Sequence, residues 1–229
     1  VFLVVGVGGL CWRFVPRKSF EQLGRLRDSI STQIPNTLSR AESAGGFRLL
    51  FNGKDLTGWK AAGENWTVED GAIKRTGSGG NLQYDAETMP DNFELRFQWK
   101  IAASAHSAVI YRPGGYQYHI VDNREPVPRE ARKMAAGIYD FIGPSVDKTK
   151  PVGEWNEARI LCVGTKVEHW LNGEKVVAFD YAAPEWEPLV RSFKQKNRIR
   201  FSNRGGNLIL HDRRGTVWFR DLKLKTILE

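Results

Sequence analysis

The sequence predicts an all-β protein, a β-sandwich or jelly roll of antiparallel sheets, preceded by an extension that is apolar and partly helical. Short apolar runs punctuated by turn residues follow one another from residue 47 onward, a spacing typical of sandwiches and jelly rolls. Helical periodicity is almost absent after residue 46, and no repeat of roughly 20–50 residues is found. The chain has 229 residues, which is enough to bury a substantial core in one β domain.

The extension, residues 1–46, is predicted to combine an apolar segment with a stalk or linker. Residues 1–12 are almost wholly apolar but too few to cross a membrane as a helix, and we interpret them as the remnant of a leader or anchor. An apolar tail packed on the domain is the alternative. Residues 13–44 have partial helical periodicity that Pro35–Asn36 interrupts, so we expect a helical or loosely ordered stalk before Gly45–Gly46.

The second unit, residues 47–229, is predicted to form strands in close succession. The most regular alternation of apolar and polar side chains runs through residues 93–101, which indicates a strand with one buried face. Asp70–Gly71 and Asn172–Gly173 lie between apolar runs, as hairpin turns do. The predicted strands span residues 47–51, 66–68, 72–74, 81–84, 93–101, 107–112, 116–121, 137–141, 155–163, 166–171, 175–179, 207–211 and 216–224.

A hairpin in the middle of this unit is predicted to carry a polar face. In the strand after the turn at residues 113–115, two tyrosines and an isoleucine point to one side, while Gln117 and His119 point to the other. The Pro-Gly-Gly turn joins this strand to the one before it. A favourable register would place His106 and Arg112 beside Gln117 and His119, so we expect the functional site on this face.

Composition and charge limit the classes of molecule that are expected to bind this protein. The net charge is +8 and the pI is near 9.6, yet no RNP, zinc-finger or helix-turn-helix pattern is present, so no nucleic-acid partner is expected. The basic residues are spread along the chain, which indicates a solvated basic surface or one that meets an anionic glycan or envelope. Cys11 and Cys162 lack the spacing of a metal site and are not expected to form a disulfide.

A series of motifs occurs in the order and spacing of a known family. They are Leu50–Trp59, Trp66–Gly71, Asp91–Leu95, Gly153–Asn156, His169–Gly173 and Val217–Leu224. Through them the chain resembles the 3-keto-disaccharide hydrolase domain family from Phe47 to Leu228. The resemblance implies a concanavalin-like jelly roll of two antiparallel sheets. It also implies activity on glycosides whose sugar carries a ketone at its third carbon.

The chain departs from the family pattern at several polar positions. Gln117 stands where the family usually has a carboxylate, and Arg213 where it has a histidine. His106, His119 and His211 stand where the family has other polar residues. An amide in place of an acid at position 117 favours a binding protein, whereas the three histidines favour catalysis.

Cleavage next to a ketone needs a base, a group that stabilises an enolate oxygen and an acid for the leaving group. We predict that His119, His106 and His211 supply base and acid, because imidazoles titrate near neutral pH. Arg112 is predicted to stabilise the enolate oxygen. If His106, His119 and His211 converge, they also form a set able to hold a divalent metal, and no other cofactor is predicted. The predicted sugar contacts are Gln117, Asp122 and Tyr139.

The leading functional prediction is a hydrolase that acts on 3-keto-glycosides by elimination and hydration, with the sugar held on the concave sheet. The alternative is a non-catalytic carbohydrate-binding module of the same fold, and a basic surface-adhesion domain is a third reading. The first two take a carbohydrate as their partner. With residues 1–12 as a leader or anchor, the protein is expected outside the cytoplasm, periplasmic or secreted, with a membrane tether in the anchored form.

Overall fold

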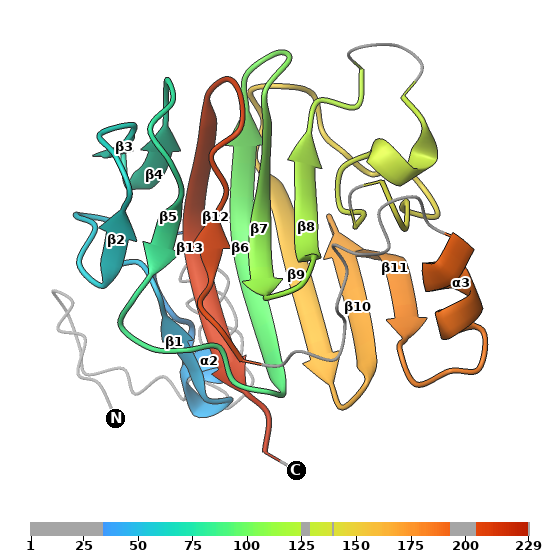
Figure 1. Cartoon of the computed structure of the whole chain (residues 1–229). Coiled ribbons are helices and arrows are strands. Elements are labelled where there is room, and N and C mark those ends of the chain that lie inside the picture. Colours follow the sequence, from blue (N-terminus) through green and yellow to red (C-terminus); the bar gives the residue numbers. More distant parts are fainter. Residues whose placement is uncertain (1–33, 125–128, 139, 193–204, 229) are drawn as a thin grey trace, which may run out of the picture.

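Two antiparallel sheets pack face to face in the computed structural model, which describes residues 34–124, 129–138, 140–192 and 205–228 (Figure 1). This arrangement confirms the predicted β-sandwich. The two sheets are joined by crossovers, since strands distant in the sequence are neighbours in both. Among the described residues no helix is long and apolar enough to cross a membrane.

The strands divide into a large sheet and a small sheet. In the large sheet the order is β11 (Glu174–Asp180), β10 (Lys166–Leu171), β9 (Asn156–Val163), β6 (Phe93–Ile101), β13 (Val217–Thr226), β4 (Ala72–Arg75) and β3 (Trp66–Glu69), and β1 (Phe47–Leu49) pairs with β13. In the small sheet the order is β2 (Trp59–Ala61), β5 (Leu82–Tyr84), β12 (Ile209–Leu210), β7 (His106–Arg112) and β8 (Tyr116–Val121). The helical elements are α2 (Arg40–Ala44), the 3-10 helix η1 (Ala131–Lys133) and α3 (Trp186–Ser192).

The core lies between the two sheets and follows the alternation in the sequence. The inward residues of β6 are almost wholly buried, and so are the tyrosines of β8. Phe97 and Tyr118 meet edge to face across the interface, with ring centroids 5.4 Å apart and ring planes at 81°. Each large side chain buried in this way stabilises the fold by about 1.5–3 kcal/mol. The outward face of β8 is thereby left for polar groups, as the sequence indicated.

One predicted strand is wrong. The described residues of the stretch 137–141 do not form a strand: Ile138 makes an isolated bridge with Ile142, and the Ile138 N–H donates to the Ile142 carbonyl (2.8 Å). Ala136 and Asp140 have φ values of 67° and 58°, which an extended strand excludes. The apolar pattern of this stretch, which suggested a strand in the sequence, belongs to residues that pack beside β8.

Part of the predicted linker is held against the large sheet. Asn36 and Asp221 exchange hydrogen bonds between backbone N–H and side-chain oxygen, at 2.8 and 2.9 Å. Asp221 lies at a bulge in β13 and has φ 59°. The α2 helix that follows begins with a capping box between Ser39 and Glu42, and Lys223 donates to the Glu42 carboxylate at 3.2 Å. The leader interpretation of residues 1–12 and most of the predicted stalk lie outside the described residues, and the boundary at residue 46 stays a prediction.

A buried ion pair connects the two sheets near the predicted site. Arg75, at the end of β4 in the large sheet, is fully buried and donates to the Asp212 carboxylate and the Gly215 carbonyl. The other carboxylate oxygen of Asp212 accepts the backbone N–H groups of Gly79 (3.0 Å) and Gly80 (2.8 Å). Residues 211–215, which follow β12 in the small sheet, are therefore fixed in place by β4 and the loop after it.

Replacement of Asp212 by Asn should lower the free energy of unfolding by about 3–5 kcal/mol, because it leaves the Arg75 guanidinium buried without its counter-charge. Urea unfolding monitored by tryptophan fluorescence measures the change. Glu187→Gln is the matched control, because it breaks the exposed Arg191–Glu187 pair and should cost less than about 1 kcal/mol. Equal losses in the two variants would contradict a structural role for the Arg75–Asp212 pair.

Candidate active site

The outer face of the small sheet brings together the three histidines that the sequence singled out. His119 lies opposite Ala108 in the register of β7 and β8, and the backbone N–H of His211 donates to the Ala108 carbonyl (2.9 Å). His119 and His211 therefore flank Ala108 on the neighbouring strands. His106 lies two residues along β7 from Ala108, on the same face.

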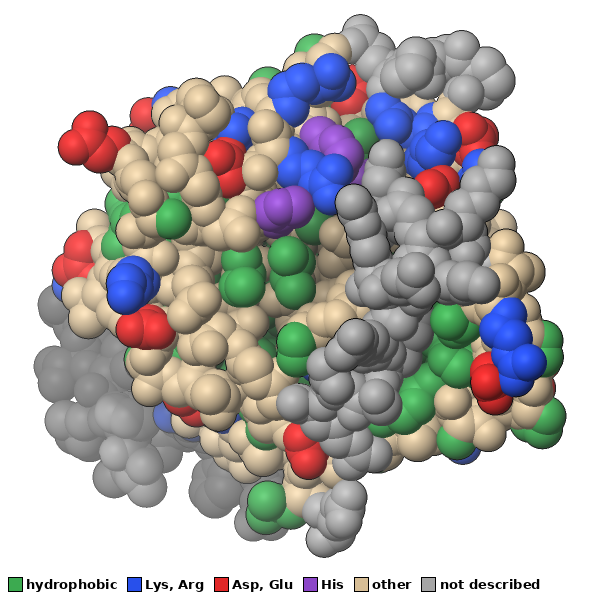
Figure 2. Space-filling model, viewed as in Figure 1, with side chains coloured by type: hydrophobic (Ala, Val, Ile, Leu, Met, Phe, Trp, Pro, Cys, Tyr) green, Lys and Arg blue, Asp and Glu red, His purple; other side chains and the backbone are tan. Residues whose placement is uncertain are grey.

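Two adjoining hollows make this face a groove. The first has a volume of about 530 Å³ and lies beside the histidines; its lining residues are His106, Val121, Arg129, His211, Asp212, Arg213 and Arg214. The second is of similar volume, meets the first at Asp212 and includes Lys60, Asn81, Gln83 and Ile209. Figure 2 shows histidine and basic side chains gathered on this face of the molecule. We call the first the arginine hollow and the second the amide hollow.

Hydrogen bonds fix the protonation pattern of the histidine pair. Nδ1 of His119 lies 3.1 Å from the Met134 carbonyl, which can only accept, so Nδ1 carries the proton. In the neutral ring Nε2 of His119 is then an acceptor. It lies 2.6 Å from Nε2 of His106, which must therefore donate. The Nδ1 atom of neutral His106 consequently carries a lone pair, as a general base requires.

The third histidine has the opposite pattern. The Nε–H of Arg213 donates to Nδ1 of His211 at 3.1 Å. Since Nδ1 accepts, Nε2 of neutral His211 carries the proton and is a donor. One hollow thus contains a candidate base, the neutral imidazole of His106, and a hydrogen-bond donor, the N–H of His211.

The surroundings keep all three imidazoles neutral at physiological pH. Burial and, next, the Arg213 guanidinium lower the pKa of His106 to about 3 and that of His211 to about 4. Burial, followed by the proximity of His106, lowers the pKa of His119 well below its usual value. Neutral rings are the forms in which the tautomers derived above apply.

Arg112 does not lie where the sequence placed it, so its predicted role at an enolate oxygen is withdrawn. A bulge between Ile110 and Arg112 shifts the register of β7 and turns the side chain inward. Arg112 is fully buried between the sheets, 5.6 Å from the ring centroids of both Phe93 and Tyr116, and donates to the Asp91 carbonyl. This guanidinium stabilises the end of the hairpin.

The predicted sugar contacts have different placements. Gln117 is half-buried on the outer face, opposite Ile110, but it is not among the described residues that line the two hollows. The carboxylate of Asp122 is a turn cap that accepts the N–H groups of Arg124 (3.0 Å) and Ser104 (3.3 Å). Tyr139 lies outside the described residues.

The donor set does not fit the predicted metal centre. Both ring nitrogens of His119 are already engaged, one by the Met134 carbonyl and one by His106, which leaves no lone pair for a metal ion. Within the described part of the chain, no group of three or more His, Cys, Asp or Glu residues is arranged to hold a metal. The three histidines meet, but as a hydrogen-bonded pair with a third ring nearby.

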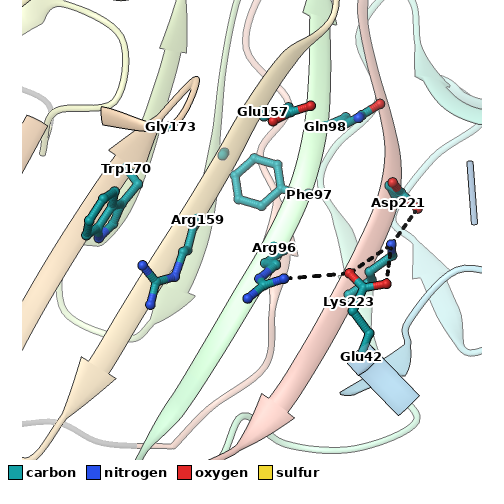
Figure 3. A pocket seen from close by; sticks show the side chains of 11 residues that line it. Glu42, Arg96, Phe97, Gln98, Glu157, Arg159, Trp170, Gly173, Asp221 and Lys223 are labelled. Atoms are coloured by element: carbon teal, nitrogen blue, oxygen red, sulfur yellow. Dashed lines mark hydrogen bonds and ion pairs between the residues drawn. The ribbon is translucent and has the colours of Figure 1, made fainter. Parts of the chain in front are cut away.

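A further pocket lies on the outer face of the large sheet and has a different character (Figure 3). Its charged groups neutralise one another: Lys223 lies 3.2 Å from Glu42 and 3.4 Å from Asp221, and Arg96 lies 3.6 Å from Glu42. These contacts hold the α2 segment to the sheet. We therefore place the candidate site in the groove of the small sheet.

Sequence reasoning missed the basic residues of the site. Arg129 and Arg214 join Arg213 in the lining of the arginine hollow, although Arg129 follows β8 and the other two follow β12. The only signal was the adjacent pair Arg213–Arg214 after His211, which carries no information about a partner from another segment. His169, the fourth histidine, lies in the core, where Nδ1 donates to the Ala136 carbonyl and Nε2 accepts from Tyr111, both at 2.7 Å.

Known proteins resemble this chain over most of its length. Residues 46–225 match the model of the 3-keto-alpha-glucoside-1,2-lyase-like domain. A 3-keto-disaccharide hydrolase of Bacteroides thetaiotaomicron is 26% identical, covering 87% of this chain and 84% of the relative. A crystal structure of a candidate glycosyl hydrolase from Parabacteroides distasonis is 29% identical, with a TM-score of 0.75, over 85% of this chain and 100% of that one. A second from the same organism shares the fold at 22% identity and a TM-score of 0.64, covering 79% and 99%.

The buried histidines predict a loss of stability in acid. In the unfolded chain a histidine protonates near pH 6.5, but burial holds the pKa of His169 at about 4 in the fold. Between these values the unfolded chain binds more protons, so the free energy of unfolding rises with pH across this window. Urea unfolding at several pH values should show that rise, and His169→Gln should reduce its slope by about 1.4 kcal/mol per pH unit. An unchanged slope in the variant would rule out His169 as a contributor.

Proposed function

The chain belongs to the 3-keto-alpha-glucoside-1,2-lyase-like domain family, and from this we propose that it is a carbohydrate-active enzyme that cleaves 3-keto-glycosides in the groove of the small sheet. The observation that carries the proposal is the linked set of neutral imidazoles. His106 and His211 line the same hollow, and their hydrogen bonds fix the tautomer of each ring. A surface that only binds carbohydrate has no need of neutral imidazoles with fixed tautomers.

The reaction uses the ketone at the third carbon of the sugar. A base removes the proton from the second carbon, and the electron pair moves into the ketone to give an enolate. Collapse of the enolate forms a double bond between the first and second carbons and expels the glycosidic oxygen, which takes up the proton that the base removed. Water then adds across the double bond, so that the net result is hydrolysis.

Each group of the site has a role in this scheme. Nδ1 of His106 accepts the proton from the second carbon, and His119 positions His106 through the Nε2–Nε2 hydrogen bond. The N–H of His211 and the guanidinium of Arg213 stabilise the enolate oxygen, a task for which fixed donors are effective. Arg213 thus takes the part that the sequence had assigned to Arg112.

The second hollow provides room for a second sugar unit, so the groove can take a substrate larger than one sugar. The amide hollow offers Asn81, Gln83 and Lys60, whose side chains can hydrogen-bond to hydroxyl groups. It meets the arginine hollow at Asp212. A sugar unit in each hollow would place the bond between the units near His211.

Replacement of His106 by Gln should lower kcat on a chromogenic 3-keto-glucoside by about 10²–10⁴-fold, the usual contribution of a general base. His119→Gln should also lower kcat and should move the acid limb of the pH–rate profile, because it alters the environment of the His106 ring. Arg191→Gln is the control, since this exposed side chain on α3 pairs with Glu187 and does not line either hollow. Turnover by His106→Gln at the rate of the parent protein would remove His106 from the mechanism.

A non-catalytic carbohydrate-binding module is the second candidate function, and Gln117 is the residue that favours it. This amide lies on the outer face of the small sheet, at the position where the family usually has a carboxylate. If the module is correct, 3-keto-glucosides will raise the melting temperature without being turned over. If the enzyme is correct, turnover will be measurable in the parent protein, and a faster Gln117→Glu variant would show that the lost acid once assisted it.

The location outside the cytoplasm and the membrane tether remain proposals that rest on the apolar residues 1–12. A fusion of residues 1–46 to a reporter that is active only after export would test them. Export of the reporter supports the leader, and retention of the exported reporter in the membrane fraction supports the tether.

A further inference from the structure

We propose that the sugar bound in this groove is anionic and that the arginine hollow holds its carboxylate or sulfate group. The inference rests on the proposed function in taking a sugar as the ligand, and it adds the charge of that sugar. It comes from the lining of the hollow, to which Arg129, Arg213 and Arg214 all contribute.

The lining is strongly biased toward positive charge. Among the described residues of the lining there are three guanidinium groups and two imidazoles against one carboxylate, that of Asp212. This carboxylate is directed away to Arg75 and to the backbone N–H groups of Gly79 and Gly80. A ligand entering the hollow therefore meets mainly hydrogen-bond donors and a positive potential.

Backbone contacts hold the arginines at this place. Arg214 and His106 exchange backbone hydrogen bonds at 2.8 and 3.0 Å, which extends the pairing of the small sheet past β12. The Arg214 side chain also donates from Nε to the Ser104 carbonyl at 3.0 Å. Arg213 is tied to His211. The site is thus built into the sheet, with donors positioned before a ligand arrives.

The groove is polarised along its length. The amide hollow contributes Asn81, Gln83 and Lys60, whereas the arginine hollow contributes the guanidinium groups. Guanidinium groups bind carboxylates and sulfates through paired N–H donors, a geometry that neutral hydroxyl groups do not match. An oligosaccharide with an acidic unit at one end and a neutral unit at the other fits this distribution of charge.

Binding of sugars that lack the ketone tests the inference without turnover. Titration calorimetry would compare methyl glucoside, methyl glucuronide and glucose 6-sulfate, at about 0.02 M and about 0.5 M salt. We expect at least one of the two acidic sugars to bind about tenfold or more tightly than the glucoside at low salt, with a smaller difference at high salt. A preference for the glucuronide indicates a uronic acid, and a preference for the sulfate indicates a sulfated sugar.

Substitutions of the lining arginines test whether the anionic group of the sugar binds in the arginine hollow. Arg129→Gln and Arg214→Gln should each reduce the preference for the acidic sugar by about tenfold, whereas Arg129→Lys should keep most of it. Arg191→Gln, an exposed arginine on α3, is the matched control and should leave the preference unchanged. Should Arg214→Gln unfold because it loses the Ser104 contact, the Arg129 variants still decide the question.

Equal binding of the glucoside and both acidic sugars would overturn the inference, as would absence of binding by all three. A preference that survives in both Arg129→Gln and Arg214→Gln would overturn it too, since the anion would then be held elsewhere. These results are separate from the catalytic proposal, because failure to cleave 3-keto-glucosides leaves the preference for acidic sugars intact. Cleavage of neutral 3-keto-glucosides with no such preference would remove the anion site alone.

Discussion

The ion pair between Arg75 and Asp212 is the interaction on which the site depends. It joins β4 of the large sheet to the segment that follows β12 in the small sheet, and the Arg75 side chain is fully buried. A buried pair of this kind is costly to break because one charge is then left without its partner. Since His211 and Arg213 lie on either side of Asp212, the same contact that connects the sheets also sets the position of an imidazole and a guanidinium.

A chain of hydrogen bonds then fixes the orientation and the tautomer of each of the three histidine rings. The Met134 carbonyl orients His119, His119 orients His106, and Arg213 orients His211. Each step fixes which ring nitrogen carries the proton, and burial keeps the rings neutral. Three residues of one type thereby acquire different roles. The basic groups nearby supply a positive potential that suits both an enolate and an anionic sugar.

The alternation of side chains in β6 and β8 was sufficient to predict strands and the face that each residue occupies, and His106 and His119 were correctly grouped on that basis. The sequence placed Arg112 on the wrong face of the sheet, because a bulge in β7 inserts one residue and reverses the faces of the residues beyond it. The local sequence pattern does not reveal such a bulge. The turn around Ile138 was taken for a strand because its apolar residues are spaced as in one. Both errors come from backbone geometry that packing imposes.

The sequence by itself determined the sandwich, the family and the polar face of the central hairpin, because these follow from periodicity, turn residues and motifs that are local in the chain. Only the tertiary structure decided that Arg129 joins Arg213 at one hollow, and that His106 rather than His119 presents its lone pair. The physical reason is that both facts depend on contacts between segments far apart in sequence. Such contacts are set by sheet register and by the partners available at each buried polar atom.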